Sequence, residues 1–539
     1  MVSSPSLPST IAEAAEWLRD GRTTSTLLTE ALLQRAHAAQ VSLGAFVAFT
    51  DEAALAAARQ ADAELARGVD RGPLQGIPLG VKDIIATRDA PTTANSNVLD
   101  RAWGDRDDAT VVARLRTAGA VLVGKLVLHE YATGFPDPAT GFPIARNPWK
   151  PTHVPAGSSS GTGVAVAAGL VLGGLGTDTS GSIRGPSAYC GISGLKPTFG
   201  RVSKEGCVPL GYSLDNIGPM ARTARDCALM LQVLAGYDPK DLCSADRPVP
   251  DYASALNGSL RGVRVGVPRG YFFDAPDLDA EVRTAVLGAV EAMAHAGADV
   301  REVAIPHAAE GQTATTVTIR SESYAYHERD LRERPRVYGK WTRQVLQLGA
   351  LFTAADFVQA QRLRALLQAE CAAALADVDV LVVPTMTSAA TPFSSFNPDS
   401  RIAGASFTGI WNLVGLPALS VPCGFTAAGL PIGMQIVGRP FDEARVLAVG
   451  DAYQRVTDWH ARRPPEPPGE AIPYEPPAPR PVPPRQSAVD AVVEQTRLTL
   501  VDDDRARLDA AYAPLQEQLA RMRAALRSEA EPALTFRAG

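Results

Sequence analysis

Two short turns rich in serine and glycine, residues 156–161 and 179–182, contain the side chains best suited to nucleophilic chemistry. Glycines in such turns permit positive φ angles and close approach of the backbone to an anion. The segment 155–198 that contains both turns is also rich in Val and Leu, which flexible Gly/Ser linkers lack. It contains neither GxxxxGK[ST] nor GxGxxG, so a phosphate-binding loop is not indicated. The segment therefore predicts a functional site, with a helix of about twelve small residues between its turns.

A second interpretation of the first turn is a nucleophile elbow, because residues 157–161 satisfy G-x-S-x-G with Ser159 at the centre. That pattern marks a nucleophile only on a strand–turn–helix elbow that an acid and a histidine follow in the chain. The preceding residues, NPWKPTHVP, are typical of an irregular loop rather than a strand. Four histidines could serve as the base, but none lies in a distinctive sequence setting: His295, His307, His327 and His460. A Ser–His–Asp esterase of the α/β-hydrolase type stays open as an alternative.

A lysine is the other available base, and Lys82 is the best placed one. It follows the apolar run of GIPLGVKDI, where a buried strand should end, in a chain with only seven lysines. Burial disfavours the charged ammonium, and lowering a lysine pKa by ~3 units corresponds to ~4 kcal/mol. The alternative is a structural lysine that pairs with Asp83.

Composition sets the broad class of the protein. The 539 residues are 46% hydrophobic, as in a globular protein, and the net charge of -6 argues against a general nucleic-acid-binding surface. The six cysteines form no CxxC pair, which fits a reducing compartment better than a disulfide framework or a zinc site. No signal peptide or membrane-spanning stretch is apparent, so we expect a cytoplasmic protein that does not bind membranes.

The elements that must position these residues alternate between helices and short apolar runs. This alternation predicts an α/β fold with a mostly parallel sheet. The expected strands are residues 76–81, 120–123, 263–267, 380–383 and 432–437.

The C-terminal part of the chain differs in composition from the rest. From 464 to 484, eleven of 21 residues are proline, which favours an extended surface segment. Apolar residues then recur at helical spacing: Leu508, Tyr512, Leu515, Leu519, Met522 and Leu526. We therefore expect a catalytic domain at 1–463, a Pro-rich linker at 464–486 and a helical extension at 487–539.

Several segments together resemble the amidase signature family over about residues 8–460. They include GIPLGVKD, NPWKPTHVPAGSSSGTGVAVAAG, LGTDTSGSIRGPSAYCGISGLKPT and WNLVGLPALSVPCGF, in the family's order. The resemblance implies one α/β/α fold, in which helices flank a large central mixed sheet. It also implies hydrolysis or transfer of carboxylic amides by a Ser–cisSer–Lys triad, with no metal or cofactor.

Carried over residue by residue, the resemblance makes Ser182 the nucleophile that forms the acyl-enzyme, Ser158 the bridging serine with a cis peptide bond, and Lys82 the base. The backbone N–H groups of Thr179, Ser180, Gly181 and Ser182 match the oxyanion hole. Ser159 and Arg184 match residues that hold these turns together. Ser160 and Ser180 stand where the family usually has glycine, which adds small side chains beside the reacting centre.

The substrate follows less directly from these motifs. By position, four residues are candidates for lining the pocket: Tyr131, Thr133, Phe135 and Trp411. Their aromatic character favours an apolar or aryl substrate over a small polar one. The resemblance leaves an aryl amide, a urea or a carbamate as possible substrates; a homodimer is considered and no nucleic acid is expected. The tail, however, resembles the small helical C subunit of tRNA-dependent amidotransferases. The alternative function is therefore a glutamine-hydrolysing subunit of such an enzyme.

Overall fold

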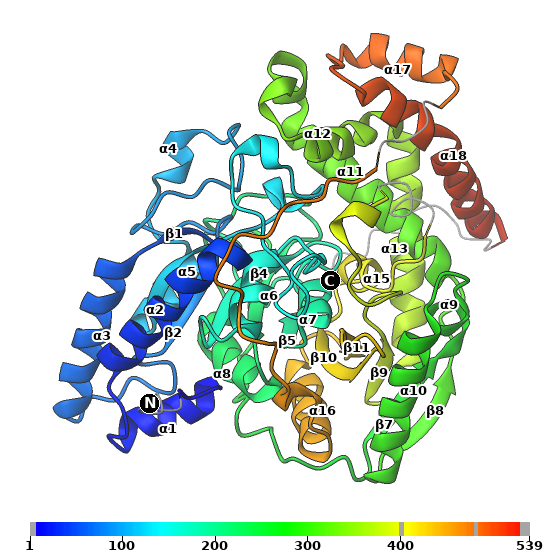
Figure 1. Ribbon diagram of the computed structural model, residues 1–539. Helices are drawn as coiled ribbons and strands as arrows, with labels where there is room; N and C mark the ends of the chain where they lie inside the picture. Colours follow the sequence, from blue (N-terminus) through cyan, green and yellow to red (C-terminus); the bar gives the residue numbers. More distant parts are fainter. Residues whose placement is uncertain (1–6, 398–403, 479–482, 529–539) are drawn as a thin grey trace.

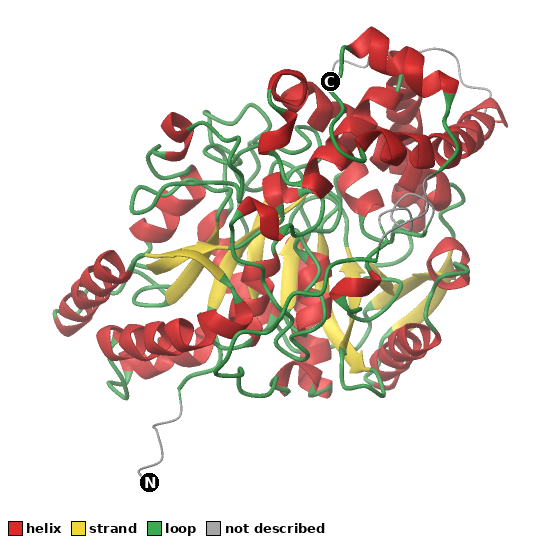
Figure 2. Cartoon of the chain, turned by 45° about the horizontal axis from the view of Figure 1, so that its top comes forward, coloured by secondary structure: helices red, strands yellow, loops and turns green. Residues whose placement is uncertain are grey.

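A central sheet with helices on both faces organises the protein, which is described as a computed structural model of residues 7–397, 404–478 and 483–528 (Figures 1 and 2). Within those ranges the sheet has eleven strands in the order β1-β3-β2-β4-β6-β5-β10-β11-β9-β7-β8. The strands are β1 (Phe46–Phe49), β2 (Pro78–Lys82), β3 (Val121–Leu126), β4 (Gly173–Asp178), β5 (Ser193–Lys196), β6 (Asn216–Ala221), β7 (Arg264–Pro268), β8 (Asp299–Val303), β9 (Val380–Pro384), β10 (Ala418–Phe425) and β11 (Pro431–Val437).

The helices cover both faces of this sheet and one of its ends. They are α1 (Ile11–Arg19), α2 (Ser25–Leu43), α3 (Asp51–Ala66), α4 (Arg101–Gly104), α5 (Thr110–Thr117), α6 (Ser160–Ala167), α7 (Arg184–Cys190), α8 (Ala224–Leu234), α9 (Arg269–Asp274), α10 (Ala280–His295), α11 (Ala308–Glu333), α12 (Lys340–Gln347), α13 (Ala354–Ala374), α15 (Gly409–Leu413), α16 (Glu443–Val456), α17 (Ser487–Thr496) and α18 (Asp504–Ser528). Short 3₁₀ segments include η4 (Leu348–Leu351).

All five expected strands are present, as β2, β3, β7, β9 and β11, and the α/β class with a large mixed sheet is confirmed. The expectation of a mostly parallel sheet is wrong. Strands β2, β3 and β4 pair in parallel, as do β7, β8 and β9, but β4 pairs with β6 and β10 pairs with both β5 and β11 in antiparallel fashion. The antiparallel central strands are buried on both faces, so they lack the polar–apolar alternation by which such strands are usually recognised.

The segment between the two serine turns also differs from the expected twelve-residue helix. It forms α6, which has eight residues, and then β4 with the sequence GGLGTD. Glycine is depleted in strands, so this sequence hides the strand. The structure explains its use, because a Cβ on Gly176 would lie 2.6 Å from the sulfur of Met220 on neighbouring β6.

The C-terminal extension packs on the core. The predicted apolar stripe is confirmed as the buried face of α18, where Leu508, Leu515 and Met522 are at most 2% exposed. Leu508 and Leu515 join Leu348 and Leu351 of η4 in one apolar cluster. The Pro-rich segment runs across the molecule from α16 toward α17 (Figure 1), and the Arg146 guanidinium donates to the carbonyl oxygens of Ile472 and Pro473.

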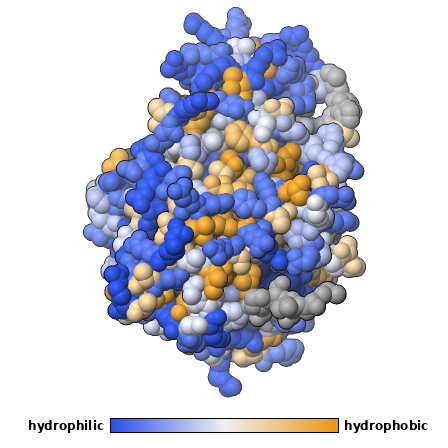
Figure 3. Space-filling model, turned by 60° about the vertical axis from the view of Figure 1, so that its left-hand side comes forward, coloured by the Kyte–Doolittle hydropathy of each residue, from blue (hydrophilic) through white to orange (hydrophobic). Residues whose placement is uncertain are grey.

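The protein surface is mixed in character. Hydrophilic side chains predominate on the face seen in Figure 3, with apolar side chains gathered toward its middle. Within the described ranges, no helix has both the length and the apolar character that crossing a membrane requires.

Candidate functional site

Lys82 and the turn 179–182 are neighbours because their strands are neighbours. Strands β2 and β4 run in parallel, with Val81 opposite Leu175, so their carboxyl ends meet at one edge of the sheet. Lys82 is the last residue of β2, and its Nζ donates to Ser158 Oγ at 2.8 Å and to Thr177 Oγ1 at 2.6 Å. Two predicted residues, Lys82 and Ser158, are thus in direct contact, and Thr177 is a partner that the motifs did not indicate.

The environment of Lys82 favours its uncharged form. The side chain is 0% exposed, and burial lowers its pKa from 10.5 to about 7, against the opposing effect of Cys207, Asp178 and Asp215. A lysine with a pKa near 7 is partly deprotonated at neutral pH, so its amine can accept a proton. Asp83 does not supply the pairing that the structural alternative required, because its carboxylate lies 3.1 Å from a different lysine, Lys125.

The two serine turns lie against each other. The Gly157–Ser158 peptide bond is cis, and Ser159 N donates to the carbonyl oxygen of Ser182 at 3.2 Å. The Ser182 side chain is partly exposed, whereas Ser158 is 2% exposed. Ser182 is therefore more accessible to solvent than Ser158, which contacts the buried lysine.

The Ser159 side chain connects the first serine turn to β4. It is 0% exposed, and its Oγ lies 3.2 Å from both the N and the O of Thr177. These contacts occupy the hydroxyl with backbone groups of β4. They also remove the basis for an elbow nucleophile at this position. Of its candidate bases, His327 contacts the Tyr338 hydroxyl at 2.9 Å and His307 contacts the Glu370 carboxylate.

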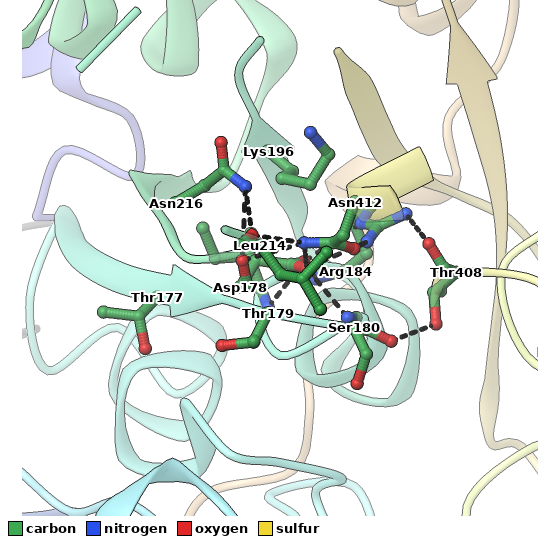
Figure 4. A network of polar contacts seen from close by, with 12 residues as sticks. Thr177, Asp178, Thr179, Ser180, Arg184, Lys196, Leu214, Asn216, Thr408 and Asn412 are labelled. Carbon is green, nitrogen blue, oxygen red and sulfur yellow. Dashed lines mark hydrogen bonds and ion pairs between the residues drawn. The ribbon is translucent and has the colours of Figure 1, made fainter. Parts of the chain in front are cut away.

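An ion pair between Asp178 and Arg184 supports the turn 179–182 (Figure 4). Both side chains are 0% exposed. The Asp178 carboxylate also accepts from the backbone N–H of Gly181 at 2.7 Å and of Ile183 at 3.1 Å. Burial alone would raise the pKa of Asp178, but the Arg184 guanidinium outweighs it and holds that pKa well below its usual range. One carboxylate thus fixes the path of the chain on both sides of Ser182.

Residues from a distant part of the chain complete this support, and the sequence analysis missed them. Arg184 Nη2 donates to Asn412 Oδ1 at 2.6 Å, and Arg184 Nη1 donates to the carbonyl oxygen of Thr408 at 2.9 Å. The Thr408 hydroxyl donates to the carbonyl oxygen of Ser180 at 2.6 Å (Figure 4). Gly181, with φ of 129°, lies so close that a Cβ would be 2.4 Å from Thr408 Oγ1. The spacing of 224 residues between Arg184 and Thr408 gives no local sequence signal.

A cavity of about 320 Å³ adjoins the lysine side of this site. Thr177 and Thr179 line it together with Cys207, and Ala132 contributes from the loop after β3. Burial raises the pKa of Cys207 to about 12, so its thiol is neutral. Thr179 is fixed at the cavity wall because its hydroxyl donates to Asp215 at 2.6 Å.

The four residues expected to line a substrate pocket lie in different surroundings. Tyr131 is 2% exposed and packs edge-on against His327, and the Thr133 hydroxyl accepts from Arg320 at 3.2 Å. Phe135 stacks on Phe396 with 3.7 Å between ring centroids. Trp411 is 0% exposed and stacks on Phe272 inside the main hydrophobic core, so its ring is a packing element and lines no cavity described above.

Comparisons with known proteins agree with this geometry. The A-type subunit of a glutamyl-tRNA(Gln) amidotransferase from Roseiflexus sp. (strain RS-1) is 44% identical over 480 residues, covering 84% of this chain and 98% of that protein. The solved peptide amidase from Stenotrophomonas maltophilia is 33% identical with a TM-score of 0.74, covering 86% of this chain and 99% of that one. The solved A-type subunit of the glutamyl-tRNA(Gln) amidotransferase from Thermotoga maritima is 30% identical with a TM-score of 0.71, covering 86% and 98% of the two chains.

These relatives correct one expectation from the sequence. A small-molecule amide as the only partner, with a homodimer considered and no nucleic acid expected, is contradicted by a relative at 44% identity that is one subunit of a glutamyl-tRNA(Gln) amidotransferase. The net charge of -6 argues only against a nucleic-acid-binding surface on the chain itself and does not bear on partner subunits.

The family model named Amidase matches residues 27–447, a range that includes Lys82, both serine turns, Arg184 and Asn412. The relatives and solved structures named above are amide-processing enzymes of the same architecture. This chain belongs to the amidase family and is an amide-hydrolysing enzyme.

Proposed function

We propose that the chain cleaves amides through an acyl-enzyme on Ser182, with Lys82 as the base and Ser158 as the relay. The observation that carries this proposal is the 2.8 Å contact between Lys82 Nζ and Ser158 Oγ, at a lysine whose pKa burial lowers to about 7. A general base needs both a hydrogen-bonded path and a pKa near the working pH, and Lys82 has both.

In the first step the neutral Lys82 amine accepts the proton of Ser158 Oγ, and Ser158 Oγ takes the proton of Ser182 Oγ. The Ser182 oxygen attacks the substrate carbonyl carbon and gives a tetrahedral oxyanion. The proton on Lys82 returns through Ser158 to the leaving nitrogen, and the C–N bond breaks. Water then attacks the acyl-Ser182 ester by the same proton path, which releases the carboxylic acid and restores the free hydroxyl.

Backbone N–H groups of the turn 179–182 bind the oxyanion in this proposal. The Gly181 N–H already donates to Asp178, so the proposal assigns the oxyanion to the N–H groups of Thr179, Ser180 and Ser182. Each well-aligned donor of this kind is worth ~3 kcal/mol in the transition state. The Asp178–Arg184 pair supports this role because it fixes the turn before substrate arrives.

We further infer that the amide is glutamine and that the chain acts as the A-type subunit of a tRNA-dependent amidotransferase. Ammonia released at Ser182 would then pass to a partner subunit, where it would displace phosphate from the side-chain carboxyl of glutamate esterified to tRNA, after a nucleoside triphosphate has phosphorylated that carboxyl. The support is the 44% identity to a named A-type subunit, of which this chain matches 98% of the length. A reaction on tRNA would place the protein in the cytoplasm.

The C-terminal extension fits the same proposal. Residues 448–539 lie beyond the family model, and their helical part resembles the small C subunit of these enzymes. Its α18 packs on α11, α12 and α13, and the Asp504 carboxylate, which is 0% exposed, accepts from Arg343 Nε at 2.8 Å. We infer that the extension at 487–539 does in one chain what a separate small subunit does elsewhere, with 464–486 as the linker.

The test is ammonia release from glutamine by the full-length chain, with Ser182→Ala as the matched control. The assay is run with the chain alone and with a glutamyl-tRNA(Gln)-binding partner subunit plus charged tRNA. We expect partner- and tRNA-stimulated glutaminase activity that Ser182→Ala lacks. Efficient hydrolysis of unrelated amides with no glutaminase activity under either condition would contradict the glutamine assignment but leave the Ser182 mechanism intact.

A further inference from the structure

Behind the first serine turn lies a small cavity whose lining includes two residues with a buried, unpartnered polar atom. The cavity measures about 20 Å³, and Asn95, Glu130, Phe135 and Ser160 are among the residues that line it. Asn95 is 4% exposed and Ser160 is 2% exposed. Among the residues that the structure describes, neither Asn95 Oδ1 nor Ser160 Oγ has a hydrogen-bond partner.

Glu130 does not satisfy these two atoms, because within the described residues its hydrogen bonds go to other groups. Its Oε1 accepts from Ser96 Oγ at 2.6 Å, and its Oε2 accepts from Gly339 N at 2.9 Å. Buried polar atoms in folded proteins nearly always have a partner, and ordered water is the usual one where protein groups are absent. A water molecule needs about 10–15 Å³ and at least two polar neighbours, and this cavity offers both.

We propose that one ordered water molecule occupies this cavity, donates a hydrogen bond to Asn95 Oδ1 and exchanges another with Ser160 Oγ. An amide oxygen accepts and a hydroxyl both donates and accepts, so a single water satisfies both atoms. The wall also includes Asp137 and Thr140, whose side chains already have partners. The Asp137 carboxylate accepts from Ala139 N and Lys340 N, and Thr140 Oγ1 donates to the carbonyl oxygen of Asp137.

The position of this water gives it a role in the reaction. Ser160 is the first residue of α6 and lies two residues after Ser158. Asn95 lies in a loop that is hydrogen-bonded to Asp83, the residue after Lys82. Ala94 N donates to the carbonyl oxygen of Asp83 at 2.8 Å, and Thr93 N donates to Asp83 Oδ2 at 3.1 Å. The water therefore joins the first residue of α6, which follows the relay serine closely in the chain, to the loop that contains Asn95.

One feature of the chain fits this bridge. Ser160 stands where the family usually has glycine, so its hydroxyl is an addition of this chain that the triad alone does not require. Ser160 and Asn95 are positioning residues, because they act on Ser158 and Lys82 only through the water.

A crystal structure of the full-length protein tests the site directly and independently of the proposed substrate. We expect one density peak within about 3.2 Å of both Asn95 Oδ1 and Ser160 Oγ. A direct contact between the two side chains, or a dry cavity, would overturn the inference.

Variants test the role of the water. Ser160→Ala and Ser160→Gly remove one partner, whereas Thr162→Val removes a hydroxyl on the same helix that instead donates to the carbonyl oxygen of Leu175. With the best amide substrate found, we expect both Ser160 variants to lose the water and about five-fold in kcat while KM stays within about two-fold, as expected for one bridging hydrogen bond that aligns the reacting groups. Thr162→Val should keep the water. Unchanged kcat in a Ser160 variant shown to lack the water would overturn the positioning role.

Discussion

Asp178 and Arg184 form an ion pair of 2.8 Å in which neither side chain is exposed to solvent. The same carboxylate accepts the backbone N–H groups of Gly181 and Ile183, which flank Ser182. Charge balance in the core and the shape of the turn 179–182 therefore depend on one side chain. This coupling makes the pair a sensitive place to test the proposed mechanism.

Asp178→Asn should cost both stability and turnover. The amide cannot neutralise Arg184, and breaking a buried ion pair by removing one partner typically costs about 3–5 kcal/mol. Chemical denaturation measures this loss, and amide hydrolysis by the folded fraction measures the effect on the turn. Asp299→Asn is the matched control, because the Asp299–Arg301 pair is half exposed and should contribute little to stability. Equal effects of the two substitutions would contradict the role given to Asp178.

The rate of amide hydrolysis should fall as pH decreases through about 7. The protonated Lys82 ammonium cannot accept a proton, and burial lowers the pKa of Lys82 to about 7. Below that pH the rate should therefore drop about ten-fold per pH unit. The measurement is kcat/KM from pH 5 to 9, and a rate that stays constant down to pH 5 would argue against Lys82 as the base.

The same lysine should make stability depend on pH above neutrality. Because the folded pKa is about 7 and the unfolded value is 10.5, the unfolded chain binds more protons between these values. Stability should thus rise with pH across this window, by at most about 1.4 kcal/mol per pH unit. Lys82→Met removes the titrating group, and denaturation of this variant should show a smaller increase than the natural chain over the same range.

Thr177→Val should weaken the base without unfolding the protein. The substitution keeps the shape of the side chain but removes the hydroxyl that lies 2.6 Å from Lys82 Nζ. An oxygen acceptor stabilises the ammonium form, so its loss should move the kinetic pKa below that of the natural enzyme. A less constrained amine should also lower the maximal rate. An unchanged pH profile would mean that Thr177 does not position the lysine.

Docking of the C-terminal extension should depend on Asp504 far more than on Asp503. Asp504 is 0% exposed and accepts from Arg343 and Gln347, whereas Asp503 is half exposed in its 2.7 Å pair with Lys340. Asp504→Ala leaves the buried Arg343 without this partner, at a cost of a few kcal/mol, whereas Asp503→Ala should cost less than about 1 kcal/mol. Limited proteolysis of α17 and α18 reads out the difference. Equal cleavage of the two variants would show that this ion pair does not anchor the extension.

The sequence predicts those elements whose signal is local. Apolar runs such as 380–383 predict strands, the spacing of Leu508 to Met522 predicts α18, and the signature motifs lead to Lys82 and the serine turns. Strand β4 is not predicted from the sequence, because its glycines allow close packing but have a low strand propensity. The mixed parallel and antiparallel pairing of the sheet is not predicted either, because buried antiparallel strands lack the alternation of polar and apolar residues.

Long-range partners cannot be recognised from the chain alone. Thr408 and Asn412 support the turn 179–182 through Arg184, although they lie more than two hundred residues away in the chain. Trp411, by contrast, is a candidate pocket residue by position, but its ring packs in the core. In the sequence, an aromatic residue near a motif is compatible with either role. Only the fold distinguishes the two.

The proposed mechanism depends above all on the acyl-enzyme at Ser182, and active-site labelling can identify the nucleophile. The full-length protein is treated with a fluorophosphonate, digested and analysed by peptide mass. We expect a single label on Ser182, with no labelling of Ser182→Ala and slow labelling of Lys82→Met. A label on Ser158 or Ser159 instead, or full labelling of Ser182→Ala, would show that another residue is the nucleophile.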